Sequence, residues 1–299
     1  MRNESKILFV LGWIFLAGCQ TTESIPLETE TPPLFSSPPI FSTLAPETPT
    51  DAPTPSRELL PTPFITAPAA NQSATIPILM YHHLNDLPAS ASELDQTWTV
   101  APANFAAQID WLAARGYRTI SMTQLVAYLR DHKPLPRHPL VISFDDGWIE
   151  GYTVAFPILK RYNLTETFYV YTNALGKSLF LSRDQIKELS RAEMEIQAHT
   201  LTHPHLRTLL PDAAMKEIVD SKIFLEKELG KPVTSFAYPF GEYNAVVIEM
   251  VKRAGFQSAV TIAPGYLQRA DELFTLKRVR VSYRDTLQDF IARLPPESK

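Results

Sequence analysis

The sequence predicts an α/β domain with a mainly parallel sheet, and three observations support this fold class. Strand-like and helix-like patterns alternate from Ile76 to the C-terminus. The run Pro139–Phe144 is continuously apolar and rich in β-branched residues, which is typical of a strand buried on both faces. The longest helical pattern stops at Gly230, a common residue just past a helix end. We therefore expect one domain over residues 76–299, and a barrel fits the number of strands.

The expected elements follow one another along this domain. Strands are predicted, from their apolar runs, at residues 76–81, 117–120, 139–144, 167–171, 195–199, 233–238, 257–261 and 278–281. Helices are predicted at residues 104–115, 123–131, 150–162, 184–190, 212–229 and 244–254, with a final helix from residue 286. The first of these helices has Asn104 as its expected cap and ends before Gly116. No internal repeat is visible.

The N-terminus has the pattern of an export signal. Arg2 and Lys6 precede an apolar stretch at residues 7–17, which is too short for a comfortable transmembrane helix. The stretch closes as Leu16-Ala17-Gly18-Cys19, which resembles the lipobox of bacterial lipoproteins. We therefore expect residues 1–19 to be a lipoprotein signal peptide and Cys19 to be lipidated. The alternative is an ordinary buried cysteine beside a conventional cleavage site.

Residues 20–75 have the composition of a disordered linker. Of the 26 prolines, 12 fall in this segment, among many Thr and Ser residues and few that could pack. Its prolines keep it extended, so we expect a spacer between a membrane anchor and the domain. A glycosylated stalk or a ligand of proline-binding modules is the alternative. The expected location is outside the cytoplasm, as a cell-surface or periplasmic lipoprotein that contacts the membrane through Cys19.

Bulk composition narrows the possible partners. The net charge is −4 and no basic block stands out, so we expect no nucleic-acid partner. The 45% hydrophobic content is sufficient for a full core, and a single cysteine excludes a disulfide framework within the chain. We expect a monomer.

Two adjacent carboxylates end the buried strand at residues 139–144. Asp145 and Asp146 are costly there unless they are used or neutralised, and Gly147 permits a sharp exit from the strand. The carboxyl ends of parallel strands are where α/β folds place their chemistry. The alternative is a plain Asp-Asp-Gly turn in which one acid caps the next helix.

Two histidines follow a later strand with a spacing that suits a shared metal. His199 and His203 are four residues apart, so on a turn of helix they share one face. The zinc-protease motif is excluded because no Glu follows the first histidine. Together with one of the two aspartates they form a ligand set that leaves positions open for water and substrate, and the other aspartate remains as a general base. Two partly exposed histidines without a metal are the alternative.

These two patterns resemble a known family. Ser143-Phe144-Asp145-Asp146-Gly147 and His199-Thr200-Leu201-Thr202-His203-Pro204 are similar to the first two motifs of the polysaccharide deacetylases (NodB homology, carbohydrate esterase family 4). The resemblance covers about residues 76–294. It implies a distorted (β/α)₇ barrel and metal-dependent hydrolysis of N-acetyl groups on amino sugars. It also implies that Asp145 is the catalytic base and that Asp146, His199 and His203 bind the metal.

The third motif departs from the family pattern. Phe236-Ala237-Tyr238-Pro239-Phe240-Gly241 resembles Arg-x-Pro-Tyr-Gly, with Ala237 in the place of the arginine. The resemblance implies that the backbone N–H of Phe240 stabilises an oxyanion, a role that does not need the tyrosine hydroxyl. A plain turn is the alternative. The family's arginine orients the base, and Arg278 is the candidate replacement.

The general acid is also displaced in the sequence. The family usually carries a histidine near the C-terminus, whereas here no histidine follows His205 and the first strand ends in His82-His83. This resembles a permuted branch that includes the poly-N-acetylglucosamine deacetylases. Because the first and last strands of a closed barrel are neighbours, either can carry the histidine. We assign His82 as the acid, with His83 as its competitor, and leave Trp148 outside the catalytic set as a stacking or packing residue.

The expected function is that of a metal-dependent deacetylase acting on an N-acetylated glycan. A two-histidine, one-aspartate ligand set suits Zn²⁺, with Co²⁺, Ni²⁺ or Fe²⁺ as alternatives. An acetyl-ester hydrolase on polysaccharide and a non-catalytic glycan-binding barrel are the alternative functions.

Overall fold

The computed structural model describes residues 64–67 and 73–296. The predicted signal peptide, Cys19 and most of the predicted linker lie outside the described residues. None of the helices in the described ranges combines the length and the hydropathy needed to cross a lipid bilayer.

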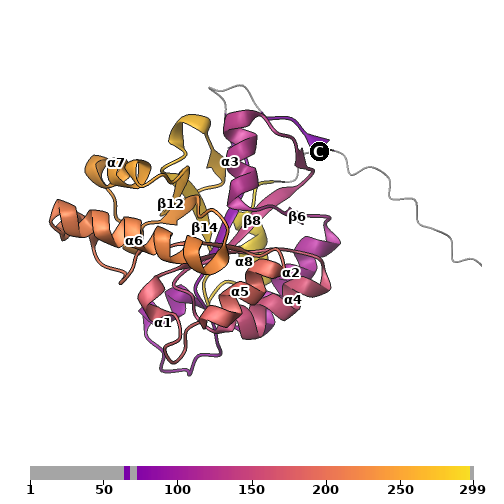
Figure 1. The fold of residues 1–299 in the computed structure, drawn as a ribbon. Helices are drawn as coiled ribbons and strands as arrows, with labels where there is room; N and C mark the ends of the chain where they lie inside the picture. Colours follow the sequence, from indigo (N-terminus) through magenta and orange to yellow (C-terminus); the bar gives the residue numbers. More distant parts are fainter. Residues whose placement is uncertain (1–63, 68–72, 297–299) are drawn as a thin grey trace, which may run out of the picture. The chain divides into compact units, whose positions relative to one another are not determined.

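The described chain forms a closed barrel of parallel strands (Figure 1). Seven described strands form the ring in the order β3, β14, β12, β11, β10, β9 and β8, and β8 pairs again with β3. Their bounds are β3 Ile78–Tyr81, β8 Pro139–Phe144, β9 Thr167–Val170, β10 Glu195–Ala198, β11 Ser235–Ala237, β12 Ser258–Pro264 and β14 Leu276–Arg280. Neighbouring strands are parallel all the way round. The predicted distorted (β/α)₇ barrel is confirmed.

The ring is irregular at two places. The predicted strand near residue 117 exists as β6 Arg118–Thr119, but it lies outside the ring and pairs with the first residues of β8. Strand β9 pairs with the last residues of β8, so β6 and β9 pair with different parts of the same strand. On the other side, the pairing of β12 with β14 shifts register between Val260 and Pro264.

Helices follow most strands and cover the outside of the barrel (Figure 1). They are α1 Glu93–Trp98, α2 Pro102–Ala114, α3 Met122–Asp131, α4 Phe156–Arg161 after a π-helical turn η1 Gly151–Ala155, α5 Arg183–Arg191, α6 Pro211–Leu229, α7 Ala245–Arg253 and α8 Leu287–Arg293. Capping boxes at Ser92, Ser121, Ser182 and Thr286 begin four of the described helices. The expected Asn104 cap is wrong, because α2 begins with a proline at its first turn, where the missing N–H costs nothing. Helix α1 was not predicted.

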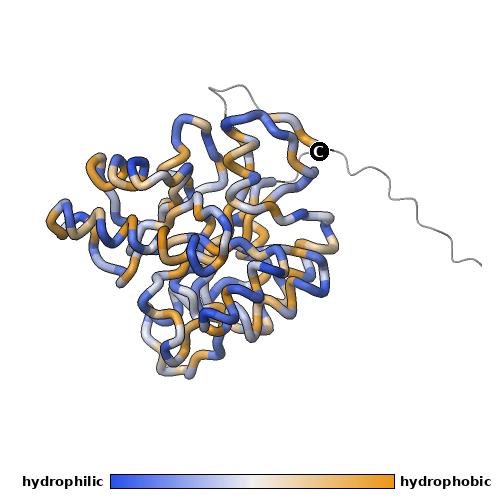
Figure 2. Tube along the Cα trace, in the orientation of Figure 1, coloured by the Kyte–Doolittle hydropathy of each residue, from blue (hydrophilic) through white to orange (hydrophobic). Residues whose placement is uncertain are grey.

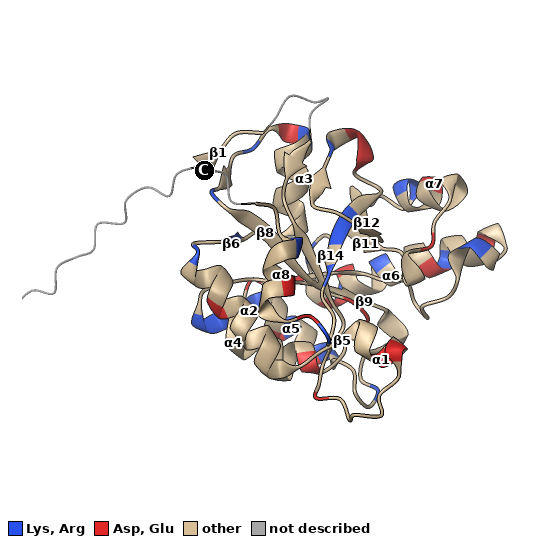
Figure 3. Cartoon of the chain, turned by 180° about the vertical axis from the view of Figure 1, so that it is seen from behind, with Lys and Arg blue, Asp and Glu red and all other residues tan. Residues whose placement is uncertain are grey.

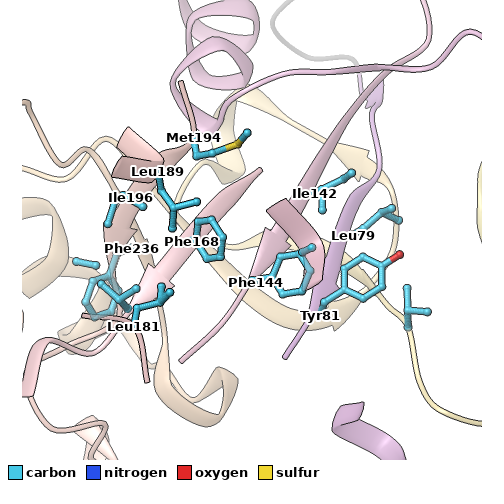
Figure 4. Close-up of a cluster of buried hydrophobic side chains, with 14 of the residues drawn as sticks. Leu79, Tyr81, Ile142, Phe144, Phe168, Leu181, Leu189, Met194, Ile196 and Phe236 are labelled. Atoms are coloured by element: carbon cyan, nitrogen blue, oxygen red, sulfur yellow. The ribbon is translucent and has the colours of Figure 1, made fainter. Parts of the chain in front are cut away.

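Apolar side chains form two clusters, one on each side of the strands. Along β8, Leu140, Ile142 and Phe144 belong to the larger cluster, whereas Val141 belongs to the smaller. The larger cluster also contains helix residues such as Leu189, so it fills the space between barrel and helices, as Figure 4 shows. In Figure 2 hydrophobic and hydrophilic residues alternate along the helices, as expected for helices with one apolar face. Because strand residues alternate in direction, Asp145 continues the row of Val141 and Ser143 on the inner face.

Short strand pairs lie outside the ring. β1 Phe64–Ile65 pairs with β7 Leu135–Pro136, β2 Ala74–Thr75 with β13 Leu267–Gln268, and β4 His83–Leu84 with β5 Thr99–Val100. The strands β1 and β2 fall within the residues assigned to the linker. Ordered structure therefore begins before the predicted boundary at Ile76. Two-residue strands that depend on distant partners leave no periodic pattern in the sequence.

Candidate active site

The carboxyl ends of the barrel strands bring the predicted polar residues to one cavity. His82 follows β3, Asp145 and Asp146 follow β8, and His199 follows β10. A cavity of about 280 Å³ opens there. It is lined by His82, His83, Leu94, Trp98, Asp145, Asp146, His199, His203, Tyr238, Phe240, Gly241 and Ile262. The site residues predicted within the described chain therefore all meet in one place.

Both aspartates reach this cavity because the chain turns sharply after β8. Asp146 has a left-handed backbone with φ 71°, and Gly147 follows with φ 79°. In a regular strand the two side chains would point to opposite faces. A Cβ at Gly147 would lie 2.9 Å from Cγ1 of Val170, so this turn requires glycine.

Asp146, His199 and His203 form a cluster of three potential metal ligands. Asp146 Oδ1 lies 3.5 Å from His199 Nε2 and 3.4 Å from His203 Nε2. One ligand atom from each residue lies within 4.8 Å of the others. Burial by itself raises the pKa of Asp146, but the hydrogen bond and charge of the histidines lower it below the ordinary carboxyl value. The aspartate is therefore a carboxylate that faces two ring nitrogens.

Hydrogen bonds and burial keep both imidazoles suited to bind a cation. His199 Nδ1 lies 2.7 Å from the carbonyl oxygen of Ala237, which can only accept, so Nδ1 carries the proton. Burial lowers the pKa of His199, but the hydrogen bond to Asp146 and the charges of Asp145 and Asp146 raise it above the usual value, so the acids favour positive charge at Nε2. Burial and the neighbouring His199 lower the pKa of His203 to about 4, so this ring is neutral at neutral pH. A divalent metal of the zinc type would take the place of the proton at His199 Nε2, and two imidazoles with one carboxylate fit such an ion.

Asp145 lies beside this cluster and is held by Arg278. The guanidinium donates from Nη1 to Oδ1 at 2.7 Å and from Nη2 to Oδ2 at 2.6 Å. Asp145 is 2% exposed and Arg278 1% exposed, so the pair is buried. Burial raises the pKa of Asp145, but Arg278 opposes it strongly enough that the pKa is lower than usual. A further bond from Arg278 Nε to the Thr261 carbonyl oxygen, at 2.8 Å, fixes the guanidinium.

Arg278 therefore makes the contact with Asp145 for which it was the candidate. It comes from β14, whose basic residues are blue in Figure 3, whereas Ala237 of the third motif is the last residue of β11. Ala237 contributes its backbone carbonyl to His199 instead. The sequence signal for this contact was the position of Arg278 at the start of a late predicted strand.

The two histidines after β3 separate in the structure. His82 Nε2 lies 3.8 Å from Asp145 Oδ2, and its ring packs on Trp98 with centroids 4.5 Å apart. Burial lowers the pKa of His82, although Asp145 and Asp146 oppose this effect. His83 instead places Nδ1 3.2 Å from Glu150 Oε1 and packs on Trp148. His82 is thus the histidine beside the candidate base.

Phe240 and Trp148 complete the surroundings of the cluster. Phe240 has φ 59°, and its ring packs against His203 with centroids 4.5 Å apart. Trp148 donates from Nε1 to Asp146 Oδ2 at 3.0 Å and stacks on Phe180. Trp148 was not predicted to belong to the catalytic set. Its position directly after the Asp-Asp-Gly turn was the signal, but the direction of its ring could not be predicted.

Known proteins share this fold and much of this sequence. A sequence profile described as polysaccharide deacetylase matches residues 132–259. YxkH of Bacillus subtilis, which carries the provisional name of a polysaccharide deacetylase, is 32% identical over 209 residues, 70% of this chain and 72% of that protein. The poly-beta-1,6-N-acetyl-D-glucosamine N-deacetylase of Staphylococcus epidermidis is 27% identical over 64% of this chain and 71% of its own length.

A solved structure agrees with these relatives. The Streptococcus pyogenes deacetylase PplD, determined in complex with acetate, superposes with a TM-score of 0.69 at 30% identity. The match covers 75% of this chain and 100% of that chain. The chain therefore belongs to the polysaccharide deacetylase family (carbohydrate esterase family 4), hydrolases that act on carbon–nitrogen bonds.

Proposed function

We propose that this protein is a metal-dependent deacetylase that removes N-acetyl groups from an amino-sugar polysaccharide at the cell surface. The observation that carries the proposal is the meeting of a two-histidine, one-aspartate cluster with an Arg278-held carboxylate and His82 in one cavity. Deacetylases of this family are divalent-metal enzymes, and Asp146, His199 and His203 would hold the ion. We propose Zn²⁺, with Co²⁺, Ni²⁺ or Fe²⁺ as alternatives.

When bound, the divalent ion supplies positive charge that polarises a carbonyl and makes a nearby water more acidic. Asp145 takes a proton from the attacking water as general base, and Arg278 holds its carboxylate in place. The backbone N–H of Phe240 stabilises the oxyanion that forms on the acetyl carbonyl oxygen when water adds to the carbonyl carbon. His82 protonates the sugar nitrogen as the C–N bond breaks, so that acetate and a free amine leave.

The proposed substrate follows from the named relatives and the cavity. The relative from Staphylococcus epidermidis is named for poly-β-1,6-N-acetyl-D-glucosamine, which supports an N-acetylglucosamine polymer as the substrate of this chain. A cavity of about 280 Å³ with the apolar side chains of Leu94, Trp98 and Phe240 at its wall accommodates an acetyl group and part of one sugar.

The proposed location rests on the N-terminal sequence. Residues 1–19 are proposed to direct export, Cys19 to carry the lipid, and the Pro/Thr-rich segment that follows to separate the membrane from the barrel. Radiolabelled lipid incorporated by the wild type, and not by Cys19→Ser, would support this anchor. Equal labelling of both would exclude it.

The experiment that tests the activity is acetate release from N-acetylglucosamine oligomers by the full chain, stripped of metal and then reloaded with zinc. We expect release only after reloading. Release that does not depend on metal would contradict the proposed mechanism. If zinc binds but no acetate appears, an acetylated xylan tested in parallel distinguishes an acetyl-ester hydrolase from a glycan-binding barrel.

A further inference from the structure

The loop that carries the second histidine is attached to helix α6 by one carboxylate. Glu217 Oε2 accepts the backbone N–H groups of Leu201 and Thr202, both at 2.9 Å. Its other oxygen, Oε1, accepts the hydroxyl of Thr202 at 2.7 Å. These two residues lie between His199 and His203 in the chain. One half-buried side chain therefore binds three donors of the segment that joins two metal-ligand candidates.

The opposite side of the same loop is held by backbone groups. The amide of Thr172 donates to the Thr200 carbonyl oxygen at 3.1 Å, and that of Asn173 donates to the Leu201 carbonyl oxygen at 2.9 Å. Within the loop, the amide of His203 donates to Thr200 Oγ1 at 2.9 Å. The carbonyl groups are thus fixed to the segment after β9, and within the part of the chain that the structure describes only the Glu217 carboxylate accepts from the amides of Leu201 and Thr202.

The backbone of this loop contains two conformations that residues other than glycine rarely adopt. Thr200 has φ 71° and His203 has φ 61°, both in the left-handed region. Such conformations cost free energy and persist only where the surroundings enforce them. A carboxylate that accepts from backbone N–H groups makes stronger hydrogen bonds than a neutral acceptor does, and Glu217 makes two such bonds and one to a hydroxyl. Its own position is set by α6, whose Ala214 and Ile218 are buried against the barrel.

We infer that Glu217 is a positioning residue for the metal site. It does not touch the substrate or the cluster; it holds the loop in the one conformation in which His203 Nε2 lies 3.4 Å from Asp146 Oδ1. This inference rests on the proposed metal site and adds a residue to which no role had been given. The resemblance, the spacing of the histidines and the composition did not point to it.

The test is zinc affinity, measured on the metal-free full chain by competition with a chelator. Glu217→Ala is expected to weaken zinc binding by about tenfold or more, as removal of outer contacts to metal ligands commonly does. Glu217→Gln retains an oxygen for the two amides and is expected to recover most of the affinity. The matched control is Asp220→Ala, which removes a carboxylate on the same helix that pairs with Lys216. It is expected to bind zinc as the wild type does.

A second measurement separates positioning from a general loss of structure. Hydrogen exchange at the amides of Leu201 and Thr202 is expected to accelerate in Glu217→Ala, while exchange in the barrel strands stays unchanged. If Glu217→Ala does not fold, Thr202→Val carries the test, because it removes only the bond to Oε1. Unchanged zinc affinity in Glu217→Ala or, if that variant does not fold, in Thr202→Val overturns the inference. A wild type that binds no zinc overturns the proposed metal site with it, whereas normal binding by wild type and variant alike removes the role of Glu217 alone.

Discussion

Two buried carboxylates, in two regions of the molecule, have opposite surroundings. Asp145, at the carboxyl end of β8, is 2% exposed and meets both nitrogens of Arg278. Glu166, just before β9, is 3% exposed, and neither of its side-chain oxygens has a hydrogen-bond partner among the described residues. Arg278 lowers the pKa of Asp145 despite burial, whereas burial raises that of Glu166 well above its ordinary value of 4.5.

The difference shows that burial alone does not identify a functional acid. A buried carboxyl without a partner takes up a proton and becomes neutral, which leaves it unable to act as a base at neutral pH. A buried carboxylate with a fixed cation stays charged and ready to accept a proton. The partner, rather than the degree of burial, separates the proposed catalytic base from a structural acid.

The largest effect is expected from removing the charge of the partnered acid. Asp145→Asn keeps the shape of the side chain but takes away its ability to accept a proton, so kcat should fall by about 10³-fold, within the range for general-base groups. Glu166→Gln, measured in the same acetate-release assay, should retain most of the wild-type kcat. Equal losses in the two variants would remove the functional distinction between the two carboxyls.

The next effect is expected on stability. Arg278→Met leaves Asp145 buried without its cation, which should lower the free energy of unfolding by about 3–5 kcal/mol. Urea denaturation of the metal-free protein measures this loss. Adding Asp145→Asn to Arg278→Met should restore part of the stability, because no uncompensated charge then remains. A double variant no more stable than Arg278→Met would mean that the arginine acts through packing instead.

A smaller effect on turnover is expected from the neighbouring histidine. His82 lies 3.8 Å from Asp145, whereas His83 is held by Glu150. His82→Gln should lower kcat by about 10²-fold, because the leaving nitrogen loses its proton donor. His83→Gln is the matched comparison and should change kcat much less. A larger loss in His83→Gln would transfer the acid role to that residue.

The smallest effect is expected from Glu166 itself, and it depends on pH. Its pKa is higher in the folded than in the unfolded protein, so its stability contribution is complete below the unfolded pKa and is lost as pH rises through the folded pKa. Glu166→Met should therefore raise stability by about 1–3 kcal/mol at pH 8, and by less at pH 5. Thermal unfolding at both pH values measures this difference. Glu249→Met, at an exposed position, is the matched control for the same change of side chain at the surface.

The parts of the molecule that the sequence predicted are those with local patterns. The apolar run before Asp145 and the spacing of His199 and His203 are visible in a few consecutive residues. The alternation of elements predicted a mainly parallel sheet, and the family resemblance implied the barrel. The ring order and the closeness of these residues agree with that prediction.

The parts that were missed depend on contacts between distant segments. The strands β1 and β2 exist only through pairing with β7 and β13. Glu217 meets the loop of Leu201 across a helix packing that no periodicity specifies. The ring of Trp148 is directed by its stacking on Phe180 and its bond to Asp146. Such contacts depend on how distant segments pack against each other, and the pattern of a single segment carries no information about this packing.

The closure of the barrel by β3 and β14 has a consequence for the order in which the protein folds during synthesis. Val279 pairs with Leu79, so the last strand to be synthesised completes the ring beside the first. Arg278 and Asp145 are 133 residues apart in the chain. Contacts of such long range form late, because the loop-closure entropy must be overcome before they stabilise anything. A chain that is still being synthesised thus carries the proposed metal-binding motifs before it carries Arg278, the cation beside Asp145. The activity we propose can begin only when the final strand of the ring is in place, which confines it to the completed barrel.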